Sequence, residues 1–105
     1  MRTIRTREVL SQVYGGILAY ETEYGTQPTS SNNLDVVEIL KGKNPRKIEF
    51  ISFSPWELDP KGEVIDGWGT PIRISYPDPK NPLVQSSGAD RVWGTADDLR
   101  GENYP

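Results

Sequence analysis

The chain has 105 residues, the length of one domain, and carries a formal net charge of −3. It contains neither cysteine nor histidine, which excludes disulfides, thiolate nucleophiles and the usual zinc ligands and leaves few routes to acid–base catalysis, so we do not expect an enzyme. The small negative charge does not indicate a nucleic-acid partner or a membrane-surface partner.

Apolar residues recur at helical spacing near the start of the chain and predict an amphipathic helix over about residues 6–24. The apolar stripe consists of Leu10, Val13, Tyr14, Ile17, Leu18 and Tyr24. Thr6 is the expected N-cap, and Gly25 is expected to end the helix. Gly15 and Gly16 lie in the middle, where each costs about 1 kcal/mol relative to alanine. We therefore expect another backbone to approach them closely, and a kink or break of the helix is the alternative.

A second, shorter helix is expected over residues 33–42, after a turn-rich segment at 26–33. Asn33 is the expected N-cap and Gly42 closes the helix. Its inner face would be formed by Leu34, Val37 and Leu40.

The segment KGKNPRK, residues 41–47, gathers four basic side chains without an interleaved aromatic residue. A solvated surface loop is the favoured interpretation, because charged loops of this kind are common. Phosphate binding is the alternative.

Three segments show short alternations of β-branched and aromatic residues and are predicted as strands: residues 47–53, 71–76 and 82–87. The connections between them are too short for helical crossovers, so the strands should be antiparallel. The predicted fold is α+β, one domain over residues 1–105 with the N-terminal helix packed on a sheet of about three strands and with the sheet and loops at 47–105. Trp68, between turn residues, is expected to cover the core as a lid and not to stack on a ligand.

The stretch SSGADRVWGTADDLRG, residues 86–101, has few apolar residues to order it. Asp90, Asp97 and Asp98 would repel one another if gathered, and a cation would relieve that repulsion. Ca²⁺ prefers carboxylate and carbonyl oxygens, but the spacing is not that of an EF-hand. The alternative is an ordinary polar loop in which Arg91 and Arg100 pair with the aspartates.

Several motifs resemble those of one protein family. The runs DGWGTPIRISY, SSGAD and GTADDL, following a long helix that ends in YGTQPT, are similar to the globular part of type II secretion major pseudopilins and related type IV pilin-like proteins. The resemblance extends from about Val9 to Asp98, and its last third is the most specific part. It implies a pilin-like fold with a C-terminal loop that binds calcium.

The resemblance also implies a ligand set for that calcium ion. Asp90 matches the aspartate of the family's G-A-D step, and Asp97 and Asp98 match its acidic pair. Ser87 and Gly101 fall at or near positions where the family offers backbone carbonyl groups.

The chain departs from the family pattern in three places. Arg91 stands where the family has a glycine, and Gly67 is inserted into the family's D-P-W-G motif. The family's short basic leader and the G-F-T-L-I-E segment that heads its membrane-spanning helix are missing from the sequence. We therefore expect a soluble, truncated form that is monomeric in solution and whose full-length form is anchored to the inner membrane.

The resemblance implies a structural subunit of an extracytoplasmic secretion filament, whose partners are other pseudopilin subunits and the secretion machinery. The alternative is a stand-alone extracellular module that binds calcium or acts in adhesion. A hydrolytic carboxylate pair at Asp97 and Asp98 is disfavoured, because adjacent residues rarely address one bond from opposite sides.

Overall fold

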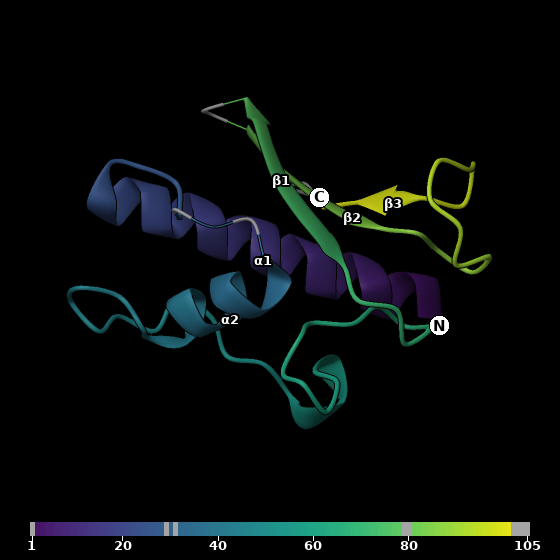
Figure 1. Ribbon diagram of the computed structural model, residues 1–105, viewed down its shortest axis with the longest axis horizontal. Helices are drawn as coiled ribbons and strands as arrows, with labels where there is room; N and C mark the ends of the chain where they lie inside the picture. Colours follow the sequence, from purple (N-terminus) through teal and green to yellow (C-terminus); the bar gives the residue numbers. More distant parts are fainter. Residues whose placement is uncertain (1, 29, 31, 79–80, 102–105) are drawn as a thin grey trace.

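The structure is a computed structural model, and it describes residues 2–28, 30, 32–78 and 81–101. Its elements are α1 (Arg2–Tyr24), α2 (Asn33–Lys41), the 3₁₀ turn η1 (Pro55–Glu57), β1 (Arg73–Asp78), β2 (Asn81–Ser86) and β3 (Leu99–Arg100). The strands form one antiparallel sheet in the order β1-β2-β3. α1 runs along the long dimension of the molecule, the sheet crosses over it, and α2 lies beside it (Figure 1). The predicted α+β class, with an N-terminal helix on a small antiparallel sheet, is confirmed.

The buried core lies between α1, α2 and the sheet. Leu10, Val13 and Ile17, one helical stripe of α1, are at most 1% exposed. From the sheet, Ile74 and Val84 are direct partners across β1 and β2, and both side chains are buried. Within the described part of the chain, neither helix combines the length and apolar character that are needed to span a bilayer.

Residues 47–53 do not form the predicted strand. The segment is extended, and the N–H groups of Phe50 and Ile51 donate to the Leu40 carbonyl at the end of α2, at 2.8 and 3.3 Å. Phe50, Ile51 and Phe53 of this segment pack against the core. The alternating pattern therefore reports a buried face without strand pairing, and the third strand is β3 instead, which pairs with β2 through Leu99 and Arg100.

The start of α1 also differs from the prediction. Thr6 is not an N-cap, because the helix already begins at Arg2 and Thr6 lies inside it. Its hydroxyl donates to the Arg2 carbonyl and accepts from the Gly67 N–H, both at 2.8 Å. The hydroxyl thus links α1 to a distant turn. The predicted end is confirmed, since Gly25 has φ +75° and donates to the Glu21 carbonyl at 2.7 Å.

The two glycines within α1 have different surroundings. The helix continues through both. A Cβ at Gly16 would lie 2.5 Å from Ile51 Cγ2, whereas one at Gly15 would meet nothing within 4 Å. The predicted close approach therefore exists at Gly16, but it is made by a side chain and not by another backbone.

α2 begins one residue away from the predicted N-cap. Asn32 is the cap, and its side-chain oxygen accepts from the Asp35 N–H at 3.3 Å. Asn33 is 8% exposed and instead binds the backbone of Val64 and Ile72. Gly42 follows the helix as predicted. The buried face consists of Asn33, Val36, Val37 and Leu40, and Leu34 is only half-buried.

Trp68 lies in the turn at residues 66–70 and is half-buried. The partly buried apolar residues that pack on the core do not include it among the described residues. Its predicted role as a lid over the core is therefore not supported. The backbone N–H of Trp68 bonds to Asp66, and its carbonyl accepts from Arg91.

Candidate functional site

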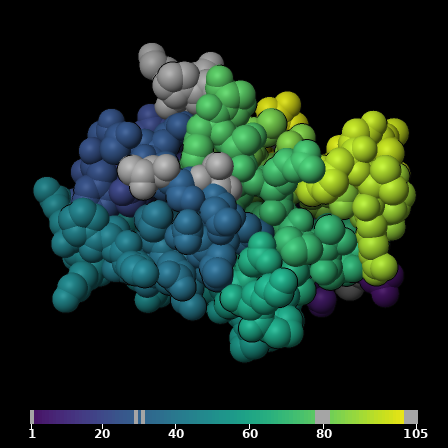
Figure 2. Space-filling view, viewed as in Figure 1, coloured from purple at the N-terminus to yellow at the C-terminus, as the bar shows by residue number. Residues whose placement is uncertain are grey.

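The connection between β2 and β3, residues 87–98, contains all three predicted acidic ligands, and we call it the acidic loop. It lies at the end of the molecule where α1 begins (Figures 1 and 2). The loop has few large apolar residues. Hydrogen bonds, two anchor points and the Arg73 guanidinium of β1, which lies 4.0 Å from the centroid of the Trp93 ring, hold it in place.

The first anchor is a buried hydrogen bond between Ser86 and Asp66. Ser86 Oγ donates to Asp66 Oδ2 at 2.7 Å and accepts from the Gly88 N–H at 3.0 Å. Asp66 is 5% exposed, and its other oxygen, Oδ1, accepts from the N–H groups of Trp68 and Thr70 at 2.9 and 3.0 Å. One carboxylate thus joins the turn at 66–70 to the start of the acidic loop.

The second anchor lies after the loop, at Gly101. Its N–H donates to the Val84 carbonyl at 2.6 Å, and a Cβ at this position would lie 2.6 Å from the Leu10 carbonyl oxygen. Only glycine fits between β2 and α1 at this distance. Gly101, a predicted site residue, is therefore placed against α1, where its lack of a side chain has a structural reason.

All three aspartates use carboxylate oxygens to fold the loop, and Asp90 uses both of its oxygens. Asp90 accepts from Thr95 Oγ1 at 2.6 Å and from the Val92 N–H at 3.0 Å. These bonds, first the one from Thr95 and then the one from Val92, hold the pKa of Asp90 below its usual range. Asp97 Oδ2 accepts from the Asp90 N–H at 3.2 Å. Asp98 Oδ2 accepts from the Gly94 N–H at 2.9 Å.

The alternative interpretation paired Arg91 with the aspartates, but its guanidinium bonds to the backbone of Trp68 instead. Its Nη2 donates to the Trp68 carbonyl at 2.9 Å, so the side chain ties the acidic loop to the turn at 66–70. Its backbone has φ +57°, the left-handed conformation that glycine adopts more easily. Arg91 therefore accepts backbone strain at this position and adds a tether to the turn at 66–70.

Two oxygens in this region have no hydrogen-bond partner. Ser87 is fully buried and its Oγ is unpartnered, and Asp98 Oδ1 is buried and also unpartnered. Buried polar atoms are nearly always paired, so each such atom requires an explanation. Asp98 Oδ1 belongs to the predicted ligand set, whereas the resemblance implies the backbone carbonyl of Ser87 and not its hydroxyl; both unpartnered atoms are oxygens of the kind that Ca²⁺ binds.

The predicted ligands are brought together only in part. Asp97 bonds to the backbone of Asp90, and Gly88, with φ +77°, packs on the Asp97 backbone so closely that a Cβ would overlap its carbonyl. Among residues 2–28, 30, 32–78 and 81–101, however, no three acidic side chains gather closely enough to hold a metal ion. The donors have the right chemistry, and the gathering of the three carboxylates stays a prediction.

Two of the four basic side chains of the segment 41–47 form ion pairs within the described part of the chain. Lys43 pairs with Glu38 at 3.3 Å, and Arg46 pairs with Glu23 of α1. Both lysine and glutamate of the first pair are well exposed, so that pair adds little stability. These contacts favour the structural interpretation of the segment over a phosphate site.

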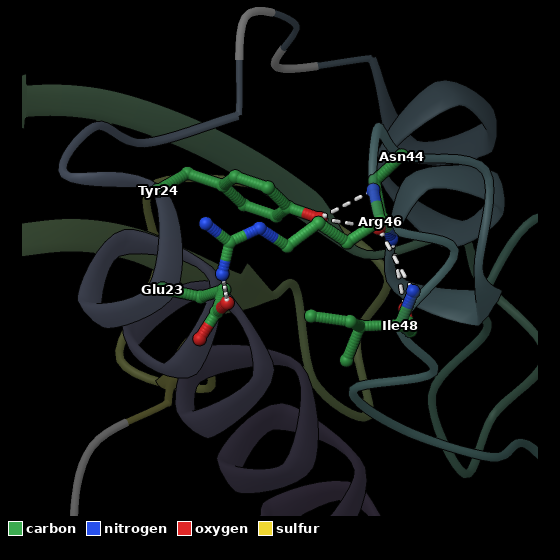
Figure 3. A network of polar contacts seen from close by, with 5 residues as sticks. All are labelled: Glu23, Tyr24, Asn44, Arg46 and Ile48. Carbon is green, nitrogen blue, oxygen red and sulfur yellow. Dashed lines mark hydrogen bonds and ion pairs between the residues drawn. The ribbon is translucent and has the colours of Figure 1, made fainter.

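Asn44 organises the same segment, as Figure 3 shows. Its side-chain oxygen accepts from the Tyr24 hydroxyl at 2.6 Å and from the Ile48 N–H at 2.9 Å. Its amide nitrogen donates to the carbonyls of Ile39 and Ile48, both at 2.8 Å. The segment is therefore a fixed turn that connects the ends of α1 and α2.

Sequence reasoning identifies the acidic loop but misses Asp66, whose motif D-G-W-G-T indicates only a turn. The signal that could have found it is the aspartate itself, since such residues often accept from the backbone two residues further on. The link to Ser86 has no local signal. No protein-family model, no curated protein and no solved structure matches this chain.

Proposed function

We propose that this chain is a structural subunit of an extracytoplasmic secretion filament, of the type II secretion pseudopilin or related pilin-like kind, and that its acidic loop binds Ca²⁺. The coarse architecture supports this, since a long N-terminal helix covers a small antiparallel sheet. The two segments that carry the resemblance also support it, because the turn at 66–70 and the acidic loop are joined by the bond between Asp66 and Ser86.

One observation carries the calcium part of the proposal: the unpartnered oxygens of Ser87 and Asp98. Asp90, Asp97 and Asp98 would supply carboxylates, and Ser87 and Gly101 would supply the further oxygens that the resemblance implies. A bound Ca²⁺ would offset the charge of the three carboxylates and join the two ends of the loop. The protein itself contributes the fold of the loop through the hydrogen bonds that Asp90 and Asp97 make.

The proposed role is mechanical. Subunits would assemble through α1, and the calcium-stabilised loop would keep the shape that neighbouring subunits contact. The partners are other pseudopilin subunits and the secretion machinery. A filament subunit requires an apolar membrane segment, so the parent gene should encode one upstream of this domain. A stand-alone calcium-binding or adhesive module does not require one.

Thermal unfolding with and without calcium tests the metal site. A site with a Kd of about 0.1 mM gains about 2 kcal/mol at about 5 mM Ca²⁺, which raises Tm by about 8–16 °C in a domain of this size. Mg²⁺ should have a much smaller effect, because it demands a tighter and more regular oxygen cage. Asp98→Asn should abolish the increase.

The matched control is Asp59→Asn, which removes an aspartate outside the loop and should leave the increase in Tm intact. A wild-type Tm that is the same in EDTA and in calcium would refute the metal site. The filament proposal would then be tested separately, by the gene sequence upstream of this domain and by assembly experiments.

A further inference from the structure

We propose that Asp66 is the positioning residue of the acidic loop: it fixes the backbone that presents the loop's oxygens to Ca²⁺ without binding the ion itself. This inference rests on the proposed calcium binding by that loop. It assigns a role to a residue that lies outside the acidic loop, 20 residues ahead of its partner Ser86.

The Asp66 side chain is almost fully buried, and a buried carboxylate requires compensation by hydrogen bonds. It has three donors: the N–H groups of Trp68 and Thr70 on Oδ1, and Ser86 Oγ on Oδ2. Asp66 is thus buried with both oxygens bonded inside the protein, which is the arrangement of a support. Asp90 also has both oxygens bonded, but its side chain is exposed.

The bond from Ser86 connects Asp66 to the acidic loop. Ser86 gives its only proton to Asp66, so the lone pairs of its oxygen face the Gly88 N–H. This fixes the backbone on both sides of Ser87, whose buried Oγ has no partner. Gly88 in turn packs directly on the backbone of Asp97. The bond to Asp66 thus determines where two of the proposed ligand positions lie.

The turn that contains Asp66 is itself held in place by hydrogen bonds. The turn at 66–70 is closed by the bond from the Asp66 N–H to the Thr70 carbonyl, at 2.9 Å. It is held to α1 by the bond from the Gly67 N–H to Thr6, and to the loop by the bond from Arg91 to the Trp68 carbonyl. Loss of a buried hydrogen-bond partner of a metal ligand typically weakens metal binding about 10- to 100-fold. Asp66 acts one residue further away, through Ser86, so we expect the lower end of that range.

The chain offers a closely matched control, because the same turn occurs twice. Asp59 Oδ1 accepts from the N–H groups at positions 61 and 63, both at 2.9 Å, just as Asp66 Oδ1 accepts at positions 68 and 70. In both turns the backbone N–H of the aspartate also donates to the carbonyl four residues on, at 2.9 Å. Two things differ: Asp66 is buried whereas Asp59 is half-buried, and among the described residues only Asp66 bonds to Ser86. The melting curves in EDTA account for the difference in burial.

The test is calorimetric titration of Ca²⁺ into the wild-type chain and into Asp66→Asn, Ser86→Ala and Asp59→Asn. An asparagine at position 66 keeps the size of the side chain, but it cannot accept hydrogen bonds on both sides. Ser86→Ala breaks the same bond from the other end and leaves the Asp66 turn intact, so it keeps the test valid if Asp66→Asn unfolds. Melting curves in EDTA measure how far each substitution destabilises the metal-free fold.

We expect a Kd about 10-fold weaker for Asp66→Asn and for Ser86→Ala, and a Kd within about twofold of wild type for Asp59→Asn. The double variant Asp66→Asn/Ser86→Ala should bind no more weakly than Ser86→Ala, because Ser86→Ala already removes the bond to Asp66 as well as the bond from the Gly88 N–H. Wild-type affinity in both single variants overturns the inference. An equal loss in Asp59→Asn also overturns it, since the effect would then follow general destabilisation.

A wild-type chain that binds no Ca²⁺ gives a different result. In that case the proposed calcium site fails first, and the role of Asp66 toward it fails with it. The wild-type titration therefore separates the two proposals.

Discussion

Replacement of Asn33 by alanine should be among the most destabilising single changes in this chain. The Asn33 amide donates to the carbonyls of Val64 and Ile72, both at 3.0 Å, and accepts from the Val64 N–H at 2.9 Å. It thereby fixes α2 to the segment that leads into the sheet. The neighbouring Asn32 caps α2 through one exposed bond to the Asp35 N–H.

The magnitude follows from the groups that lose their partners. In Asn33→Ala the Val64 N–H and the Ile72 carbonyl are left unpaired, whereas the Val64 carbonyl keeps a bond from the Ile72 N–H at 3.0 Å. Each unpaired buried group costs about 1–3 kcal/mol, so the expected loss is about 4 kcal/mol. A domain of this kind has about 5–15 kcal/mol in total. Asn32→Ala loses a cap and should cost about 1 kcal/mol.

Urea unfolding at neutral pH, followed by circular dichroism, measures both losses, provided that the slope of the transition is the same in all chains. In a separate thermal unfolding experiment, Tm should fall by about 4–8 °C for Asn32→Ala and by about 16 °C or more for Asn33→Ala. If Asn33→Ala costs no more than Asn32→Ala, then Asn33 acts as an ordinary cap and does not clamp α2 to the segment at Val64 and Ile72.

Three further predictions concern α1 and the acidic loop. Gly15→Ala should raise the free energy of unfolding by about 0.5–1 kcal/mol, and Gly16→Ala should lower it, because its Cβ would meet Ile51; chemical denaturation of both variants checks the difference in sign. Gly101→Ala should lower Tm in EDTA, since its Cβ would press on the α1 backbone, which cannot move aside as a side chain can. The depressed pKa of Asp90 favours its charged form in the folded state, so its contribution to stability is present above about pH 4 and is lost as the pH falls through the lower folded pKa. The difference in Tm between wild type and Asp90→Asn should therefore shrink on acidification, and a constant difference from neutral pH to about pH 2 would contradict this.

Hydrophobic spacing is sufficient to predict both helices and the β1–β2 hairpin, because each of these elements buries one regular face. The same pattern misleads at residues 47–53. There Phe50, Ile51 and Phe53 pack against the core from an extended segment, and this packing does not require pairing with another strand. β3 has only two residues, which is too short to produce any pattern. Strand pairing thus depends on geometry that spacing does not encode.

The polar residues show the same limit. Asn32 and Asn33 are equally suitable caps by residue type. They differ because the fold brings the carbonyls of Val64 and Ile72, more than 30 residues away in sequence, to the Asn33 amide. The carboxylates of the acidic loop could be identified because charge and oxygen chemistry are properties of the residues themselves.

The support of the loop could not be identified in this way. Asp59 and Asp66 form the same local turn, so local sequence treats them alike. Only the fold brings Ser86 to one of them. If the loop binds Ca²⁺, its affinity therefore depends on a contact between distant segments, and a chain with the same three aspartates but without that contact should present the same oxygens less precisely and bind the ion more weakly.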